Sequence, residues 1–490
     1  MSAPSRPTRP PRWLGFGSIL LANLLPLAGV FWFGWDGSTL VVIYGLELLC
    51  TFLLAGLKAL FAQRPPRTDH DESGVISVSH ELIETRGSVE LVSWLPPIYP
   101  RNLPFATAVV NSAFWFLFMA GAALSSVFTV GDVLARPEVL VSALALVVAQ
   151  SVDTWGEYLR EGYKTASPYS VIETPGRQAF FLAFVLMVTP GIGVVGVEGL
   201  LAVIVGVKLL AEWSAYRGTT DGTGRLTEWL AGPTPNRTDA DPIAVSNGTP
   251  EARISTDGRA VLYTGAFDVL GTHAPFAVLP FAFGLLFAMT FLGDGAPTAV
   301  VVAISLGFAV SFVGYLALRV LMSYLQYGSL EYRRYGDQIV AYNTLLAEPQ
   351  WSTSISTLRS VEVVPDRLAD RLLGTRTVAV TTSWGDSETR RYLGPTADPD
   401  GLVSAFELPL HTTDIGPLDR RPATVVIAIL AGLVGGVIVL LVGPWMAFGE
   451  VVFSGLLYGA FGAPFLAVVL QSVWVQSYPD RTAEPVGHSD

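Results

Sequence analysis

The chain has 490 residues, of which 51% are hydrophobic and only 14% are charged, and its mean hydropathy is +0.48. Ordinary soluble proteins carry about 25% charged residues. The formal net charge is −11, which disfavours a nucleic-acid partner. We therefore expect a polytopic membrane protein with the lipid bilayer as its main partner and no nucleic acid bound.

The sequence contains few residues of the kinds that bind a metal or a cofactor. The single cysteine, Cys50, excludes a disulfide framework and a Cys-rich metal site. The histidines are scattered, and no HExxH, GxSxG or P-loop motif is present. We expect no metal, no cofactor and no enzymatic activity. Acidic loops and scarce lysine indicate a salt-adapted prokaryotic source.

Apolar blocks of about 20 residues are long enough to cross a hydrocarbon core of roughly 30 Å. The first block is followed at once by a second, which is typical of a membrane hairpin rather than of a cleaved signal peptide. Pro190 and Gly191 interrupt residues 178–214, which form either two spans or a re-entrant element. About ten spans are expected, at residues 13–34, 38–62, 104–128, 138–157, 178–195, 198–214, 274–293, 297–323, 422–443 and 450–475.

Arginine and lysine are concentrated in alternate connections between these blocks. The second, fourth and sixth connections carry them, whereas the intervening ones are short and almost free of them. The positive-inside rule then predicts a multi-pass cell-membrane protein with both termini and all long loops in the cytoplasm.

The chain divides by composition into five parts. We expect a six-helix membrane domain at 1–215, a flexible cytoplasmic linker at 216–250, a strand-like lead-in plus transmembrane hairpin at 251–327, a β-domain at 328–410, and a C-terminal hairpin and tail at 411–490. Within 328–410, short β-rich runs alternate with turn signals, and a helix near 398–408 closes the series. The predicted strands are 330–334, 338–343, 350–355, 360–364, 375–382 and 389–393.

Residues 251–410 resemble the bacterial pleckstrin-homology-like (PH-like) domain. The resemblance rests on an aromatic-basic first strand at Tyr332-Arg333-Arg334, a Val-rich strand at Val361-Glu362-Val363, and Leu372-Leu373-Gly374 before another Val-rich strand. Members of that family often carry a two-helix membrane hairpin just before the domain. The resemblance implies a bent sheet capped by a helix, with a lipid or protein ligand.

The first half, about residues 13–215, resembles an uncharacterised family of prokaryotic multi-pass membrane proteins. The likeness is carried by the stretch Asn23–Asp36, followed by Tyr44, Glu47 and Lys58. Gly45 and Leu48 stand where the family has an aromatic and an asparagine. Because that family has no assigned activity, the resemblance implies an architecture only.

Charges inside apolar spans need a partner or a wet cavity. Glu47 and Lys208 are predicted at matching depths of roughly 14–15 Å, near the membrane midplane, with Tyr44 beside Glu47. We expect an ion pair between them. The alternative is a protonated or hydroxyl-bonded Glu47, with Lys208 bent towards the cytoplasm. Asp153 and Glu157, at i and i+4, either hold a cation or mark a helix leaving the membrane.

Two functions are compatible with this organisation. The first is a non-enzymatic scaffold, sensor or binding protein that uses the cytoplasmic PH-like domain. The alternative is a secondary transporter or channel-like protein with a polar site at Glu47, Lys208, Tyr44, Asp153 and Glu157. An intramembrane enzyme is a third and weaker hypothesis.

Overall fold

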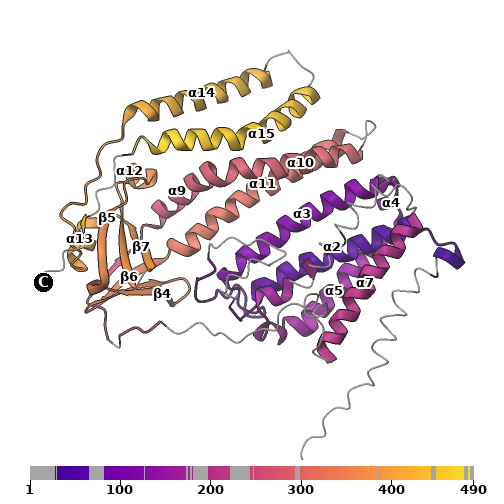
Figure 1. Ribbon diagram of the computed structural model, residues 1–490, viewed down its shortest axis with the longest axis horizontal. Helices are drawn as coiled ribbons and strands as arrows, with labels where there is room; N and C mark the ends of the chain where they lie inside the picture. Colours follow the sequence, from indigo (N-terminus) through magenta and orange to yellow (C-terminus); the bar gives the residue numbers. More distant parts are fainter. Residues whose placement is uncertain are drawn as a thin grey trace, which may run out of the picture. The chain divides into compact units, whose positions relative to one another are not determined.

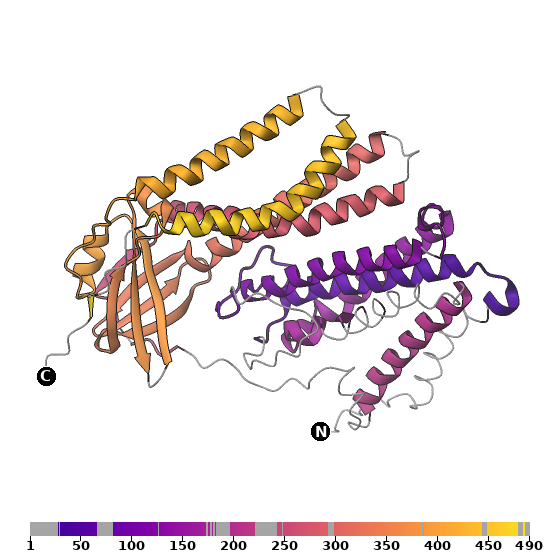
Figure 2. The same ribbon diagram turned by 45° about the horizontal axis from the view of Figure 1, so that its top comes forward.

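The computed structural model divides into two compact units, one formed by residues 1–83 and 88–240 and the other by 84–87 and 241–490. Figures 1 and 2 show the helices and strands of each unit. The structure describes residues 30–65, 82–125, 127–172, 197–220, 243–246, 248–292, 298–384, 387–442 and 448–478, together with isolated positions at 28, 175, 176, 179, 182, 484 and 485.

The first unit is helical and is centred on α2. Its elements are α2 (Gly37–Phe61), η1 (Pro100–Asn102), α3 (Leu103–Ser125), α4 (Val130–Leu134), α5 (Pro137–Asp153), the π-helical turn η2 (Thr154–Tyr158), η3 (Gly162–Lys164) and α7 (Val197–Thr220). Helix α2 packs against α3, α5 and α7.

Close contact between α2 and α3 depends on a glycine. A Cβ added at Gly56 would lie 2.8 Å from a methyl group of Val109, so a larger residue would push the helices apart. Phe52, Phe105 and Val109 are buried around this contact. Asp36 caps the start of α2 by accepting a hydrogen bond from the backbone N–H of Ser38 at 3.0 Å.

The second unit joins long helices to an antiparallel sheet domain. Its helices are α9 (Gly258–Asp268), the π-helical turn η4 (Val269–His273), α10 (Ala274–Leu292), α11 (Thr298–Tyr327), α12 (Leu368–Leu373), α13 (Pro399–Ala405), α14 (Arg420–Val442) and α15 (Phe448–Val475). Its strands are β1 (Ala252–Ser255), β2 (Leu330–Tyr335), β3 (Gln338–Asn343), β4 (Glu348–Ser354), β5 (Leu358–Val363), β6 (Arg376–Trp384), β7 (Ser387–Thr396) and β8 (Glu484–Pro485), with η5 (Ile355–Thr357) between β4 and β5.

These strands form two four-stranded antiparallel sheets, in the orders β1-β2-β3-β4 and β7-β6-β5-β8. Alternate residues of the strands bury one apolar face. Tyr332, Val361 and Val380 are fully buried there, and α13 supplies Leu402 to the same core, while Phe406 follows that helix. The six strands and the closing helix expected from the sequence are thus present, and Trp351 and Val361 lie on strands as predicted.

Two sequence expectations are wrong in this region. The lead-in to the hairpin at 251–327 was expected to be strand-like up to the first span near residue 274, but the strand ends at Ser255 and a helix begins at Gly258. Asp257 starts this helix by accepting hydrogen bonds from the backbone N–H groups of Arg259 and Ala260. Helix α9 continues through η4 into α10, so the membrane-length helix runs over Gly258–Met289 instead of beginning near residue 274.

The expected count of about ten spans is not supported. Within the described residues, four helices are long and apolar enough to cross a membrane: Gly37–Phe61, Pro137–Gly156, Gly258–Met289 and Ala299–Tyr327. Helix α7 contains Glu198 and Lys208, which lower its apolarity. Some side chains of α3, α14 and α15 are outside the described part, and most of residues 13–34, 178–195 and the linker at 216–250 lie outside the described residues.

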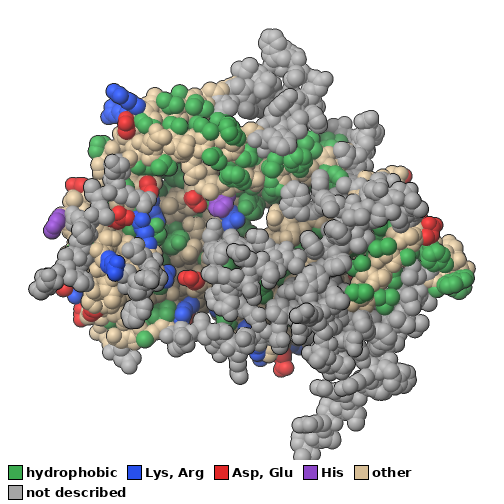
Figure 3. Space-filling view, in the orientation of Figure 1, with side chains coloured by type: hydrophobic (Ala, Val, Ile, Leu, Met, Phe, Trp, Pro, Cys, Tyr) green, Lys and Arg blue, Asp and Glu red, His purple; other side chains and the backbone are tan. Residues whose placement is uncertain are grey.

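In the second unit, the long helices and the sheets expose different kinds of side chain. Hydrophobic side chains cover the visible sides of its long helices, while charged ones gather over the sheets (Figure 3). Val425, Ile427 and Leu430 on α14, and Phe465 and Val468 on α15, are exposed in this way. Apolar surface on the outside of a helix suits contact with lipid.

Candidate functional site

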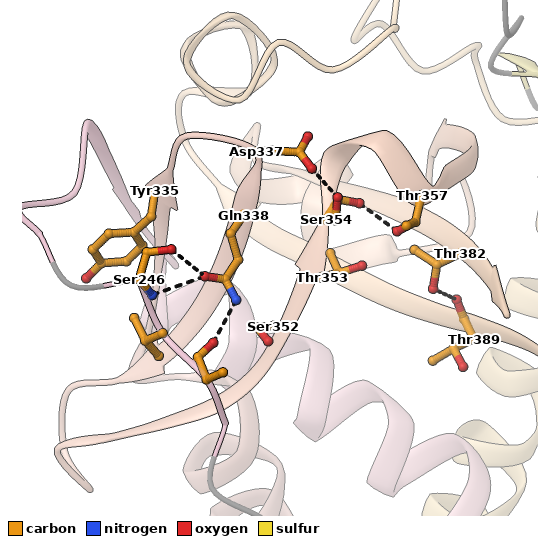
Figure 4. A pocket seen from close by; sticks show the side chains of 12 residues that line it. Ser246, Tyr335, Asp337, Gln338, Ser352, Thr353, Ser354, Thr357, Thr382 and Thr389 are labelled. Atoms are coloured by element: carbon orange, nitrogen blue, oxygen red, sulfur yellow. Dashed lines mark hydrogen bonds between the residues drawn. The ribbon is translucent and has the colours of Figure 1, made fainter.

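The sheet domain contains a cavity of about 710 Å³ (Figure 4). The strand pattern explains its position. Val378 and Val380 of β6 point into the core, and the next residue on that face is Thr382. Along β7 the same face carries Leu393, then Arg391, then Thr389. Of these, Leu393 lies in the core. The apolar core therefore ends where these threonines begin, and the space beyond them has polar walls.

Hydroxyl and amide groups dominate the cavity wall. The described lining residues are Ala244, Val245, Ser246, Tyr335, Asp337, Gln338, Ser352, Thr353, Ser354, Thr357, Thr382 and Thr389. None of these described residues is basic. Such a wall can form many hydrogen bonds with an uncharged polar ligand but supplies no cation to neutralise a phosphate or sulfate.

Asp337, at the turn between β2 and β3, is held by the loop after β4. Its carboxylate accepts hydrogen bonds from the Ser354 hydroxyl, from the Ser356 hydroxyl at 2.9 Å and from the Ser356 backbone N–H at 3.1 Å. The hydrogen bond from Ser354 is the main reason that the pKa of Asp337 lies below its usual value. The Asp337 carboxylate therefore ties β4 to the β2–β3 turn as an anion.

Gln338 binds a segment that precedes β1. Its Nε2 donates to the Ala244 carbonyl at 2.8 Å, and its Oε1 accepts from the Ser246 backbone N–H at 3.3 Å. Figure 4 shows Ser246 and Tyr335 on this side of the cavity, with Thr382 and Thr389 on the opposite side. The cavity was not predicted from the sequence, although the change from Val to Thr along β6 was a usable signal.

The first unit contains the predicted pair of charges. Lys208 Nζ of α7 donates to both carboxylate oxygens of Glu47 on α2, each at 2.8 Å. Lys208 Nζ also lies 5.0 Å from the centre of the Tyr44 ring, a cation–π distance. The expected ion pair is confirmed, with both side chains 28% exposed.

A cavity of about 170 Å³ adjoins this ion pair. Its wall combines Tyr44, Glu47, Thr51 and Lys208 with apolar residues of α2 and α7 and with Leu182. Thr51 accepts a hydrogen bond from Gln150 Nε2 at 2.7 Å and donates to the Glu47 carbonyl at 2.9 Å. Hydrogen bonds through Thr51 thus connect Glu47, a member of the ion pair, to Gln150 on α5.

The second predicted pair, Asp153 and Glu157, lies near the end of α5. Asp153 is the last residue of α5, and Glu157 lies in the π-helical turn η2. The side chains of both lie outside the described part. No group of three or more His, Cys, Asp or Glu residues able to hold a metal occurs among the residues that the structure describes.

These features define a protein with membrane-length helices and a separate antiparallel sheet domain. Residues 5–221 match the model of a family of unknown function (DUF6498), which agrees with the resemblance expected for the first half. No curated protein matches the chain. No solved structure matches it either. None of these comparisons supports a PH-like domain or a salt-adapted source.

Proposed function

We propose that this protein is a non-enzymatic membrane protein whose sheet domain binds a ligand at the cytoplasmic surface. In this proposal the four membrane-length helices cross the cell membrane, with both termini and the sheet domain in the cytoplasm. The sheet domain is PH-like: two antiparallel sheets capped by α13 and preceded by the helical pair α9–α10 and α11 support that assignment.

The observation that carries the binding role is the hydroxyl-lined cavity of about 710 Å³. Its size lies within the range of about 300–1,000 Å³ that is usual for small-molecule sites. Its described wall offers Thr382, Thr389 and Gln338 as hydrogen-bonding groups and no basic residue. The favoured ligand is an uncharged polar molecule.

Native mass spectrometry of the full-length protein, purified in mild detergent, tests the binding role. The wild type is expected to carry a co-purifying small molecule. Thr382→Val and Thr389→Val keep the side-chain shape but remove hydroxyls from the wall, so the occupied fraction falls. Thr424→Val is the matched control, because the Thr424 hydroxyl bonds to the Arg420 carbonyl of its own helix. Equal occupancy in all four proteins, or none in the wild type, would contradict the proposal.

A transporter is the second candidate function. It is favoured by the Glu47–Lys208 pair beside a cavity of about 170 Å³. Convergent charges next to a cavity between helices are typical of transport sites. Leu48 lines this cavity, so Leu48→Cys in a Cys50→Ser background reports its access. Labelling by a membrane-impermeant thiol reagent from both sides supports transport, and protection from both sides argues against it.

A further inference from the structure

The short helix α12 lies where several long helices of the second unit end. It packs against α9, which begins the membrane-length helix Gly258–Met289. The Arg371 guanidinium of α12 donates to the Gly416 carbonyl at 2.7 Å, four residues before α14 begins at Arg420. Asp419 donates from its backbone to the Ser477 carbonyl just beyond α15. Figure 1 shows α12 beside the same ends of α9 and α15.

An aromatic pair lies near the same helix ends, beside α12. Trp474, near the end of α15, donates from its indole nitrogen to the Tyr478 hydroxyl at 2.9 Å. The Arg371 guanidinium lies 5.7 Å from the centre of the Tyr478 ring. Tryptophan and tyrosine are enriched at the boundary between hydrocarbon and headgroups, and arginine stacks well on their rings. Helix α12 is thus level with an aromatic group of the kind found at membrane surfaces.

One side of α12 is fixed to the sheet domain. Ala369 and Asp370 are buried, and the Asp370 carboxylate accepts hydrogen bonds from the hydroxyls of Thr375 and Thr377 at 2.7 and 2.8 Å. Gly374, with a φ of +72°, ends the helix and turns the chain back into β6. The helix is therefore held firmly from one side.

The other side of α12 presents two leucines to the outside. Leu372 is 63% exposed and Leu373 is 41% exposed. Two adjacent leucines at the tip of a firmly held turn would expose apolar surface to water, which is unfavourable. A bilayer around α9 and α15 would cover such a tip at this level.

We propose that α12 is a membrane-surface anchor, with Leu372 and Leu373 inserted into the boundary between lipid headgroups and acyl chains. The occupant is the bilayer itself, because α12 packs against the start of the membrane-length helix Gly258–Met289, and its Arg371 lies against the Trp474–Tyr478 pair. This inference rests on the proposal that the helix Gly258–Met289 crosses a membrane. Its effect is to fix the sheet domain close to the lipid surface.

Site-directed spin labelling in lipid nanodiscs tests the anchor. The full-length chain has one native cysteine, so Cys50→Ser gives a clean background. Labels are placed at Leu373→Cys and, as a second test position, at Leu372→Cys. A label at Ser356→Cys is the aqueous control, because Ser356 is exposed before the start of β5 while α12 follows its end. The six residues of β5 span roughly 20 Å, and they separate Ser356 from α12 along the chain.

We expect the ratio of oxygen to nickel-complex accessibility to be severalfold higher at positions 372 and 373 than at 356. A ratio equal to that of Ser356 would overturn the anchor. Low accessibility to both reagents, with or without spin–spin broadening between copies, would mean that protein covers the leucines, and would overturn it as well.

A label at Leu306→Cys separates failure of the anchor from failure of the membrane assignment. Leu306 is exposed on α11, within the membrane-length segment Ala299–Tyr327. An oxygen-rich environment at Leu306 with an aqueous one at Leu373 refutes the anchor alone. An aqueous environment at Leu306 refutes the membrane-spanning helices themselves.

Discussion

At the scale of single residues, the sequence was most informative about buried charge. The depth of Glu47 and Lys208 could be counted along two apolar blocks, and a lone charge near a midplane needs a partner. The pair forms as expected. Its surroundings could not be derived in the same way, because the contact of Thr51 with Gln150 depends on how α2 and α5 pack.

The coupling of Glu47 with Lys208 gives the first prediction. Glu47→Gln and Lys208→Met each leave the other group without its partner, so each lowers the melting temperature. The double variant is expected to lose less than the sum, with a coupling energy of about 1–2 kcal/mol because both side chains are partly exposed. A double-mutant cycle on thermal unfolding measures this energy. Glu47→Gln combined with Arg319→Met, a residue of the other unit, is the control and should be additive; additivity for Glu47 with Lys208 would refute the coupling.

Asp337 gives a pH-dependent prediction. Its pKa in the folded protein lies below the ordinary 3.8, chiefly because the Ser354 hydroxyl donates to the carboxylate. A lowered folded pKa contributes stability above the unfolded pKa, and this contribution is lost as the pH falls through the folded pKa. Asp337→Ala should therefore melt below the wild type at pH 7, and the difference should shrink below about pH 4. The effect is small because Asp337 is solvent-screened. A gap that stays constant from pH 7 to pH 3 would contradict this assignment.

At the scale of elements, strands were easier to predict than helix ends. Strand β3 has the predicted bounds Gln338–Asn343, because turn signals enclose a short apolar run. In β5, Val361 faces the core, while Glu362 is also buried and pairs with Arg390. That partner lies two strands away, and alternation along one strand cannot reveal it. The start of α9 was missed because Asp257 acts as a cap within a stretch of mixed propensity.

The link between α12 and β6 gives the third prediction. Asp370 is fully buried, and its two carboxylate oxygens accept from Thr375 and Thr377. Asp370→Leu leaves both hydroxyls without this acceptor, which should cost about 1–3 kcal/mol of unfolding free energy. Adding Thr375→Val and Thr377→Val to Asp370→Leu removes the stranded groups and should recover part of the loss. Chemical denaturation of the three proteins measures this; a triple variant weaker than Asp370→Leu would contradict the hydrogen-bond explanation.

At the scale of the whole molecule, composition predicted membrane-length helices and a sheet domain but not their boundaries. The sheet domain was expected to begin at residue 328, yet β1 at Ala252–Ser255 pairs with β2 across the intervening helices. Pairing between strands separated by more than 70 residues leaves no local signal in the sequence. The change from Val to Thr along β6 could indicate one wall of the polar cavity, but the cavity itself depends on the packing of both sheets.

The position of β1 leads to the last prediction, that the helical hairpin is an insertion between two neighbouring strands of an autonomous sheet domain. Ser255 pairs with Glu331, and the Thr256 N–H donates to the Leu330 carbonyl at 3.0 Å, so the ends of the insertion lie next to each other. Residues 250–257 joined by Asn-Gly to residues 329–410 should therefore fold, because Asn-Gly favours the tight turn of a two-residue hairpin. The expected result is a soluble fragment with a β-rich circular dichroism spectrum and a cooperative melt. Residues 329–410 alone are the control: they expose the edge of β2 and lack Ile254, which packs on the core, so they should melt earlier or aggregate. Equal stability of the two fragments would show that β1 is dispensable, and a helical spectrum from the joined fragment would refute an autonomous sheet domain.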